Sequence, residues 1–379
     1  MLLFLALIVP LASSSVTQTL SQVLDRFDVE GNSEIPLTKC SRGCTIYASI
    51  SAANTAEDAN HLLIYKKPIS SQIEKYPIGE LAKINEPTKL PFELEPGDYV
   101  IVNTNVTKTG VPVVIYTVAI FQDDEMWSRV YEARLYNHTG IDAKNAPVIL
   151  MSADPFTMQK IQVDGFVEIY ASGHDALVTG TPNPCFPLYS GQDSQNLAPI
   201  PFPTPLMTIS SKSLFKNITV SMGIDSNVIL AAGQHSAILS PGYHGCGGTE
   251  RYRYNETDQP IDYVITLKDI SNMTSANFSL YSDIFTAHHA PVNVTSSSGE
   301  QLSFWGDVHN RFNQTTLQAK WMKVTSPPVY KDTSFAMRVS VKLNNPTTVA
   351  PPAETTTKAA TTLVNTIQFF IIGLLHSFL

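Results

Sequence analysis

A two-residue alternation of apolar and polar side chains recurs along the chain, as is typical of half-buried β-strands. Residues 335–343 show it most clearly: Phe335, Met337, Val339, Val341 and Leu343 lie on one side, and Arg338, Ser340 and Lys342 on the other. Other short runs are rich in β-branched and aromatic residues and are separated by Gly, Pro and Asn, so they predict further strands. These runs are 45–50, 61–65, 99–102, 111–120, 127–136, 147–151, 161–170, 218–222, 228–232, 261–268, 278–281, 302–305 and 316–323.

A helical pattern occurs at only two places. In residues 16–27 the apolar side chains of Leu20, Val23, Leu24 and Phe27 share one helical face, which predicts a short N-terminal helix. Residues 71–85 predict a second helical stretch that is broken at Pro77, because proline removes a backbone donor and clashes with the preceding turn.

Many short strands and few helices predict a mainly β fold with two or more β-sandwich domains in series. Residues 15–180 form the first β-sandwich region, of one or two modules, and residues 206–345 form a second domain that ends in a terminal strand. Between them, residues 181–205 are so rich in proline that we expect a linker or a covering loop, since proline cannot donate to a β-ladder.

Both ends of the chain indicate the secretory pathway. Residues 1–14 form an apolar run ending in small residues, which predicts a signal peptide cut near Ser14 or Ser15. Residues 346–362, rich in Thr, Ala and Pro, predict a disordered stalk, and residues 363–379 form an apolar tail of 17 residues. This order predicts a GPI-attachment signal with Ala353, Ala359 and Ala360 as candidate attachment sites, and the alternatives are a short spanning helix or a tail that packs on the protein.

Composition supports an extracellular glycoprotein. Charged residues make up only 15% of the chain and the net charge is −8, which offers nothing to a polyanion, so we expect no nucleic-acid partner. Sequons for N-glycosylation are dense between the two apolar ends, which is typical of a secreted protein. They begin at Asn105, Asn137, Asn217, Asn255, Asn272, Asn277, Asn293 and Asn313.

The four cysteines predict two disulfides, because an even count in an oxidising compartment favours pairing. Among the three possible connectivities we expect Cys40–Cys44 and Cys185–Cys246, since each pair then lies within one candidate domain. Zinc is the competing interpretation, but the Cys40-X3-Cys44 spacing is not that of a zinc knuckle and no second pair lies nearby.

The turn Ser240-Pro-Gly-Tyr243, followed by Cys246, resembles the opening of a CUB domain, which is an extracellular β-sandwich. The strand at 261–267 and the segment 301–321 resemble later parts of that family, so the similarity spans residues 233–324. It implies a CUB-like or jelly-roll β-sandwich, of the kind found in nematode-type surface proteins. CUB domains usually hold two internal disulfides, but only Cys246 lies in this stretch, so the resemblance implies a partner at Cys185.

The same resemblance implies a calcium site, because many CUB domains bind calcium through acidic residues in their loops. Asp269 and Asp307 match the outer positions of that set, whereas the middle position holds Asn277, which begins a sequon. Calcium prefers several carboxylates, so these two residues are the candidate metal ligands and no other cofactor is expected.

Catalytic motifs do not emerge from the sequence. It contains no His-Glu-X-X-His, no Gly-X-Ser-X-Gly and no phosphate-binding glycine loop, and His244-Gly-Cys-Gly-Gly248 is best interpreted as a glycine-rich turn. We therefore expect a non-enzymatic surface protein for recognition or adhesion, anchored to the membrane at its C-terminus, with an extracellular protein or carbohydrate ligand. The alternatives are a hydrolase with a nonstandard carboxylate pair and a structural coat glycoprotein.

Overall fold

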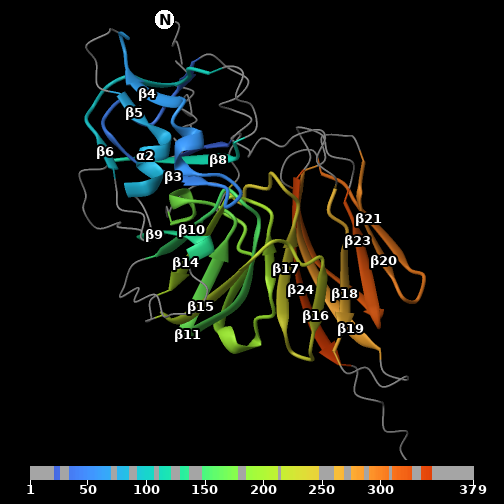
Figure 1. Cartoon of the computed structure of the whole chain (residues 1–379). Helices are drawn as coiled ribbons and strands as arrows, with labels where there is room; N and C mark the ends of the chain where they lie inside the picture. Colours follow the sequence, from blue (N-terminus) through green and yellow to red (C-terminus); the bar gives the residue numbers. More distant parts are fainter. Residues whose placement is uncertain are drawn as a thin grey trace, which may run out of the picture. The chain divides into compact units, whose positions relative to one another are not determined.

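The structure is a computed structural model, and Figure 1 shows its course. It describes residues 21–25, 34–69, 75–84, 92–105, 111–120, 129–135, 147–177, 185–211, 215–246, 260–268, 275–285, 290–306, 310–326 and 334–343. The predicted signal peptide, stalk and apolar tail lie outside these residues. The described chain is built mainly of β-strands in several sheets, which confirms the predicted fold class.

The N-terminal strands form two four-stranded sheets, in the orders β1-β8-β3-β6 and β2-β7-β4-β5. Both sheets contribute to one core, in which Ile46 of β3, Ile64 of β4 and Ile115 of β8 are fully buried. The strands are β1 (Ser21–Asp25), β2 (Ile35–Pro36), β3 (Cys44–Ile50), β4 (Leu62–Lys66), β5 (Lys75–Pro77), β6 (Phe92–Leu94), β7 (Tyr99–Asn103) and β8 (Val113–Ala119).

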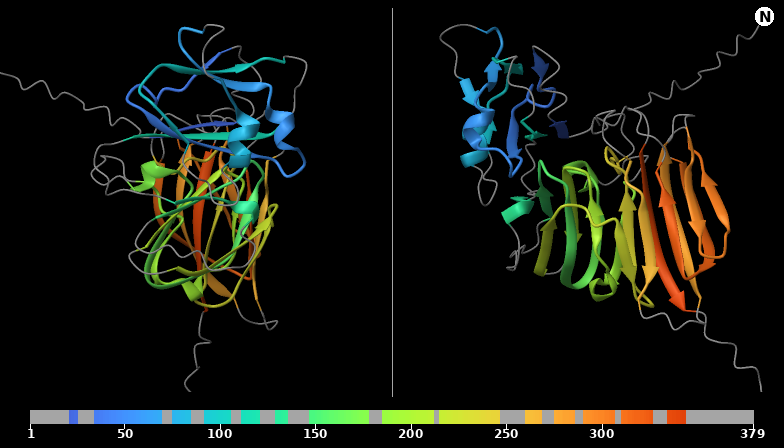
Figure 2. Two further views of the ribbon diagram at one scale, coloured as in Figure 1. Left: turned by 60° about the vertical axis from the view of Figure 1, so that its left-hand side comes forward. Right: turned by 45° about the vertical axis from the view of Figure 1, so that its right-hand side comes forward.

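The helix predicted for residues 16–27 is wrong in its described part, because residues 21–25 form strand β1, paired antiparallel with β8. Leu24 packs into the core between the two N-terminal sheets, whereas Val23 packs on the other side of the strand. A strand covered on both faces has adjacent apolar residues, and this short run mimics a helical stripe. The second helical prediction, over residues 71–85, is confirmed only after Pro77, because residues 75–77 form strand β5. The helix α2 (Ile78–Ile84) begins directly after Pro77 and packs against the 3₁₀-helix η1 (Ala56–Ala59) (Figure 2).

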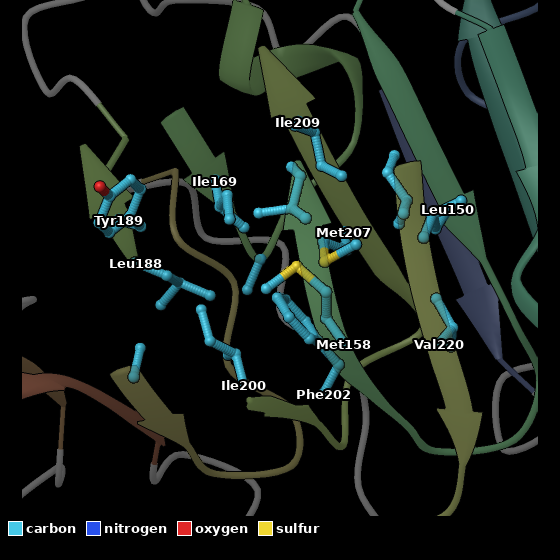
Figure 3. Close-up of a cluster of buried hydrophobic side chains, with 14 of the residues drawn as sticks. Leu150, Met158, Ile169, Leu188, Tyr189, Ile200, Phe202, Met207, Ile209 and Val220 are labelled. Atoms are coloured by element: carbon cyan, nitrogen blue, oxygen red, sulfur yellow. The ribbon is translucent and has the colours of Figure 1, made fainter. Parts of the chain in front are cut away.

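Residues 129–222 form a seven-stranded arrangement around β11. β11 pairs with β12 and β14 through its C-terminal half and with β13 and β15 through its N-terminal half, so one long strand serves two layers. The side chains between these strands converge in a dense apolar cluster (Figure 3), where the stacked rings of Phe156 and Phe202 lie 5.3 Å apart. The strands are β9 (Arg129–Glu132), β10 (Val148–Met151), β11 (Phe156–Tyr170), β12 (Tyr189–Asp193), β13 (Ile200–Phe202), β14 (Leu206–Ser211) and β15 (Phe215–Met222), and three 3₁₀-helices accompany them: η2 (Ala133–Leu135), η3 (His174–Leu177) and η4 (Ser194–Asn196).

The linker expected over residues 181–205 is not present in its described part. Residues 185–205 supply β12, η4 and β13, and Leu188, Ile200 and Phe202 are buried in the cluster of Figure 3. Proline is tolerated here because β13 pairs only with β11, so Pro201 lies on an edge strand that does not need every backbone donor.

The third region is a pair of sheets around a separate core. One sheet has the order β17-β24-β19-β22, and the other has the order β16-β18-β23-β20-β21. Phe278, Val339 and Met322 are among the side chains buried between them. The strands are β16 (Asn227–Leu230), β17 (His235–Leu239), β18 (Tyr263–Leu267), β19 (Ala276–Phe285), β20 (Val292–Ser296), β21 (Gln301–Phe304), β22 (Asn310–Ala319), β23 (Trp321–Thr325) and β24 (Ser334–Leu343).

The single strand predicted for residues 316–323 is two strands. Ala319 ends β22 in one sheet and Trp321 begins β23 in the other, so the chain crosses between the sheets at Lys320. The buried residues change from odd-numbered to even-numbered at this point, from Leu317 and Ala319 to Met322 and Val324.

Candidate functional site

The candidate site is the outer surface of the β17-β24-β19-β22 sheet, the side that faces away from the core of the third region. Its strands neighbour one another in Figure 1, where β17, β24 and β19 are labelled. We call this surface the polar face, and define it by His235 of β17, Arg338, Ser340 and Lys342 of β24, Asn277, Ser279 and Tyr281 of β19, and Gln314, Thr316 and Gln318 of β22.

Strand register arranges these side chains in rows. His235, Ser340, Ser279 and Thr316 are directly paired across the four strands and form the central row. Lys342, Asn277 and Gln318 form the row on one side, and Arg338 with Tyr281 form the row on the other. From strand spacing and rise per residue, the face measures about 14 Å in each direction.

Arg338 is the central charged group of the polar face. Its side chain is half-buried, and its guanidinium carbon lies 5.4 Å from the centroid of the Tyr281 ring. Burial lowers the pKa of the Arg338 guanidinium, and the phenols of Tyr281 and Tyr189 act in the opposite direction. Arginine remains charged in proteins, so a cation lies here over the Tyr281 ring. Among the residues that the structure describes, no carboxylate forms an ion pair with it.

Hydrogen bonds hold the aromatic side of the face in place. The Tyr281 hydroxyl donates to Gln314 Oε1 at 3.2 Å, and Gln314 Nε2 donates to the Ser279 hydroxyl at 2.8 Å. On the opposite side of Arg338, the Tyr189 and His235 rings meet edge to face with centroids 5.9 Å apart. These contacts fix the polar groups before a ligand arrives, which reduces the entropy that binding must offset.

The next row of the sheet beyond Arg338 and Tyr281 contains a buried polar contact, at which the exposed part of the polar face ends. Asp283 of β19 is fully buried and accepts a 2.8 Å hydrogen bond from the Tyr243 hydroxyl. Burial and the charge of Asp283 raise the pKa of Tyr243 well above its ordinary value, while Arg311 acts against this shift. Tyr243 is the last residue of the Ser-Pro-Gly-Tyr turn, so this turn covers one end of the sheet.

The charge of the polar face is opposite to that of the whole protein. The chain has a net charge of −8, but the face carries the two cations Arg338 and Lys342. On the same side of the sheet, the carboxylate of Asp283 is buried and hydrogen-bonded to Tyr243. The accessible part of the face therefore attracts anions although the protein as a whole is acidic.

The structure confirms both predicted disulfides, Cys40–Cys44 and Cys185–Cys246. The second joins the start of the segment leading to β12 to the glycine-rich turn after β17, and the Ser172 hydroxyl donates to Cys246 Sγ at 2.8 Å. Disulfides of this kind are those of an extracellular or secreted domain.

The described sequons lie in different surroundings. Asn277 belongs to the polar face, and Asn293 lies on the outer side of β20 in the other sheet, where it accepts a hydrogen bond from Ser303 at 2.6 Å. Asn105 follows β7 and is half-buried, while Asn217 of β15 has a buried Oδ1 atom. Asn313 lies in β22 but its side chain is outside the described residues, as are Asn137, Asn255 and Asn272.

The candidate calcium ligands Asp269 and Asp307 also lie outside the described residues, as do the candidate attachment sites Ala353, Ala359 and Ala360. Within the described residues, no group of three or more His, Cys, Asp or Glu side chains is placed to hold a metal ion. In the same part of the chain, no helix has the length and apolar character needed to cross a membrane.

The sequence pattern identified three of the ten residues that define the polar face. The alternation in residues 335–343 predicts that Arg338, Ser340 and Lys342 share a side, and the structure confirms this. Tyr281, Gln314 and Tyr189 were not identified, because they come from separate strands. Tyr281 and Gln314 are 33 residues apart in the sequence, and Tyr189 and Tyr281 are 92 residues apart. The alternation of Asn277, Ser279 and Tyr281 was a usable signal, but nothing in it identifies β24 as the neighbour of β19.

Comparison with known proteins adds little to this description. No family model matches the chain, and no curated protein is similar to it. The CUB1-EGF-CUB2 domains of rat MASP-1 match at a TM-score of 0.21 and 7% identity, over 85% of this chain and 97% of that one. A DUF4785 family protein from Legionella pneumophila matches at a TM-score of 0.19 and 11% identity, over 84% of this chain and 82% of that one. Such low scores carry no argument. The described chain is a mainly β protein with two disulfides, which are typical of an extracellular or secreted domain.

Proposed function

We propose that the protein is a non-enzymatic recognition or adhesion protein of the cell surface, and that the polar face is its ligand-binding surface. The observation that carries this proposal is the half-buried Arg338, which lies over the Tyr281 ring, beside the hydrogen-bonded side chains of Tyr281, Gln314 and Ser279. A solvated sheet face with no function needs neither a guanidinium that lacks an ion-pair partner among the described residues nor fixed side chains, because each costs desolvation or side-chain entropy.

A lipid anchor and N-glycans complete the proposal. The stalk and apolar tail of the sequence support a GPI anchor, which would hold the β-sandwiches at the outer face of the plasma membrane. The density of sequons supports a glycosylated surface, and the proposal requires Asn277, which lies on the polar face, to carry no glycan. The proposal assigns no catalytic role to the polar face.

Masking the polar face with a glycan tests this function. The full chain, with an epitope after Ser15, is displayed on cultured cells, which are then allowed to adhere to wells coated with neutral or acidic saccharides. Ser340→Asn together with Lys342→Thr creates an Asn-Val-Thr acceptor in the middle of the face. We expect this double variant to lose adhesion at unchanged epitope level, because the new glycan covers the binding surface.

Two controls make the result specific. Ile229→Thr creates an Asn-Val-Thr acceptor on β16 in the other sheet, at an exposed position, and should leave adhesion unchanged. Lys342→Thr alone separates loss of the cation from masking. Full adhesion by the masked variant, with the added glycan demonstrated by a mobility shift, would show that recognition does not use the polar face.

A further inference from the structure

Resting on the proposed function, we propose that the ligand of the polar face is an acidic saccharide, and that Arg338 binds its carboxylate. The row containing Arg338 and Tyr281 would take the acidic sugar unit, and the row of His235, Ser340, Ser279 and Thr316 would take its neighbour. The chemical class is a uronic-acid-containing chain, in which a carboxylate and several hydroxyl groups project from one ring.

The cation supports a carboxylate ligand. Arg338 is half-buried and has no ion-pair partner among the described residues, so its guanidinium has been partly dehydrated without a compensating anion. A guanidinium presents parallel N–H donors that match the two oxygens of a carboxylate. Lys342 lies two rows away and adds a second positive charge at the same surface.

The neighbours of Arg338 support a sugar. The Tyr281 ring is 37% exposed, and an aromatic face is negative, so it attracts the weakly positive C–H groups of a sugar ring. Ser279, Ser340, Thr316 and Gln314 supply hydroxyl and amide groups that both donate and accept, as sugar hydroxyls require. The fixed Tyr281–Gln314–Ser279 hydrogen bonds mean that these groups are already positioned.

An acidic peptide fits the face less well. Peptide recognition commonly depends on apolar anchors or on pairing with an open strand edge. Tyr281 is the only large exposed hydrophobic side chain among the described residues of the face, and the cation lies on β24, an interior strand of the sheet. The observations therefore favour the saccharide, and the peptide becomes an outcome of the test.

The test compares hyaluronan, which carries one carboxylate per disaccharide and no sulfate, with the same polymer after chemical reduction of its carboxyl groups. Fluorescent polymer is titrated onto cells that display the full chain, with untransfected cells as background. We expect carboxyl reduction to weaken binding by about 10- to 100-fold, the range for losing hydrogen bonds to a charged group. This arm uses the unaltered protein, so it does not depend on the folding of any variant.

Variants at Arg338 assign the carboxylate contact. Arg338→Gln should reduce hyaluronan binding by about the same factor and leave binding of the carboxyl-reduced polymer unchanged. Arg338→Lys should retain part of the affinity, because lysine keeps the positive charge but lacks the paired N–H donors of the guanidinium. Trp321→Ala, on the exposed side of the other sheet, is the matched control and should bind as the unaltered protein does.

The outcomes separate this inference from the proposed function. Equal affinity for hyaluronan and for its carboxyl-reduced form, or no effect of Arg338→Gln on hyaluronan binding, would overturn the proposal of an acidic saccharide. If masking the polar face still abolished adhesion in that case, the result would support recognition by this face of a different ligand. Binding of polyglutamate as tight as that of hyaluronan would overturn the choice of a saccharide. Failure of every coating and polymer to bind would count against both proposals.

Discussion

At the scale of single residues, the phenol side chains of Tyr47 and Tyr243 lie in the protein interior. Tyr47 is buried against Tyr116, with ring centroids 5.9 Å apart, and burial raises the pKa of Tyr47 to about 12. Burial also raises the pKa of Tyr243, whose hydroxyl donates to Asp283. In each case the folded state favours the neutral phenol, and this preference links stability to alkaline pH.

The sign of the pH dependence follows from the direction of the shift. A phenol whose folded pKa is raised contributes fully below its ordinary value of 10.0, and the contribution is lost as pH rises from there through about 12 for Tyr47. For Tyr47 this loss amounts to about 2 to 3 kcal/mol. Urea unfolding at pH 8 and pH 11 should show about half of this loss, because pH 11 lies midway between the two pKa values, and Tyr47→Phe should show a smaller decrease between the two pH values. Equal decreases in both proteins would contradict this interpretation of Tyr47.

At the scale of elements, alternation predicted the strands well but did not predict their partners. The strand at 335–343 was expected from its own residues, yet its place between β17 and β19 depends on contacts with residues about 100 and 60 positions earlier. Errors arose where context overrode local pattern. Residues 21–25 form a strand because both of their faces are covered, and the proline-rich segment before residue 205 packs because Leu188, Ile200 and Phe202 fill an apolar cluster.

The residues of the polar face were also only partly predictable from the local sequence pattern. Arg338, Ser340 and Lys342 were predictable as one side of a strand, but their chemistry depends on Tyr281, Tyr189 and Gln314, which only the folded sheet brings near. The calcium candidates Asp269 and Asp307, which depended on a family resemblance, lie outside the described residues. Local periodicity therefore indicated one strip of the face, and tertiary pairing created the surface.

The two disulfides should differ in their contribution to stability. Cys185–Cys246 closes a chain separation of 61 residues, whereas Cys40–Cys44 closes a separation of 4. Loop-closure entropy then predicts a loss of about 4 kcal/mol for Cys185→Ala with Cys246→Ala, and about 2 kcal/mol for Cys40→Ala with Cys44→Ala. Thermal unfolding of the two double variants compares these losses. A larger loss from the short disulfide would show that packing around Cys40 and Cys44 outweighs chain entropy.

At the scale of the whole molecule, we propose attachment to the membrane through a lipid anchor. Cells displaying the epitope-tagged full chain would be treated with phosphatidylinositol-specific phospholipase C, next to a control protein with a known lipid anchor. We expect release of the epitope into the medium, because residues 346–379 resemble a stalk followed by an attachment signal. Retention, with the control released, would favour a short spanning helix in residues 363–379.

The two sheets of the third region expose different side chains. One sheet of the third region exposes Tyr281 beside a cation and fixed polar groups, whereas the other exposes Ile229 and Trp321 in one row of paired strands. This contrast lets a single experiment ask which of them a saccharide contacts.

Hydroxyl-radical footprinting of the full chain, with and without a hyaluronan oligosaccharide, tests the central claim most directly. Tyr281 is 37% exposed and Trp321 is 41% exposed, so the two aromatic side chains are closely matched probes of the two sheets. The account predicts that the saccharide reduces oxidation of Tyr281 several-fold and leaves oxidation of Trp321 unchanged. Unchanged oxidation of Tyr281, or protection of Trp321 instead, would contradict recognition by the polar face.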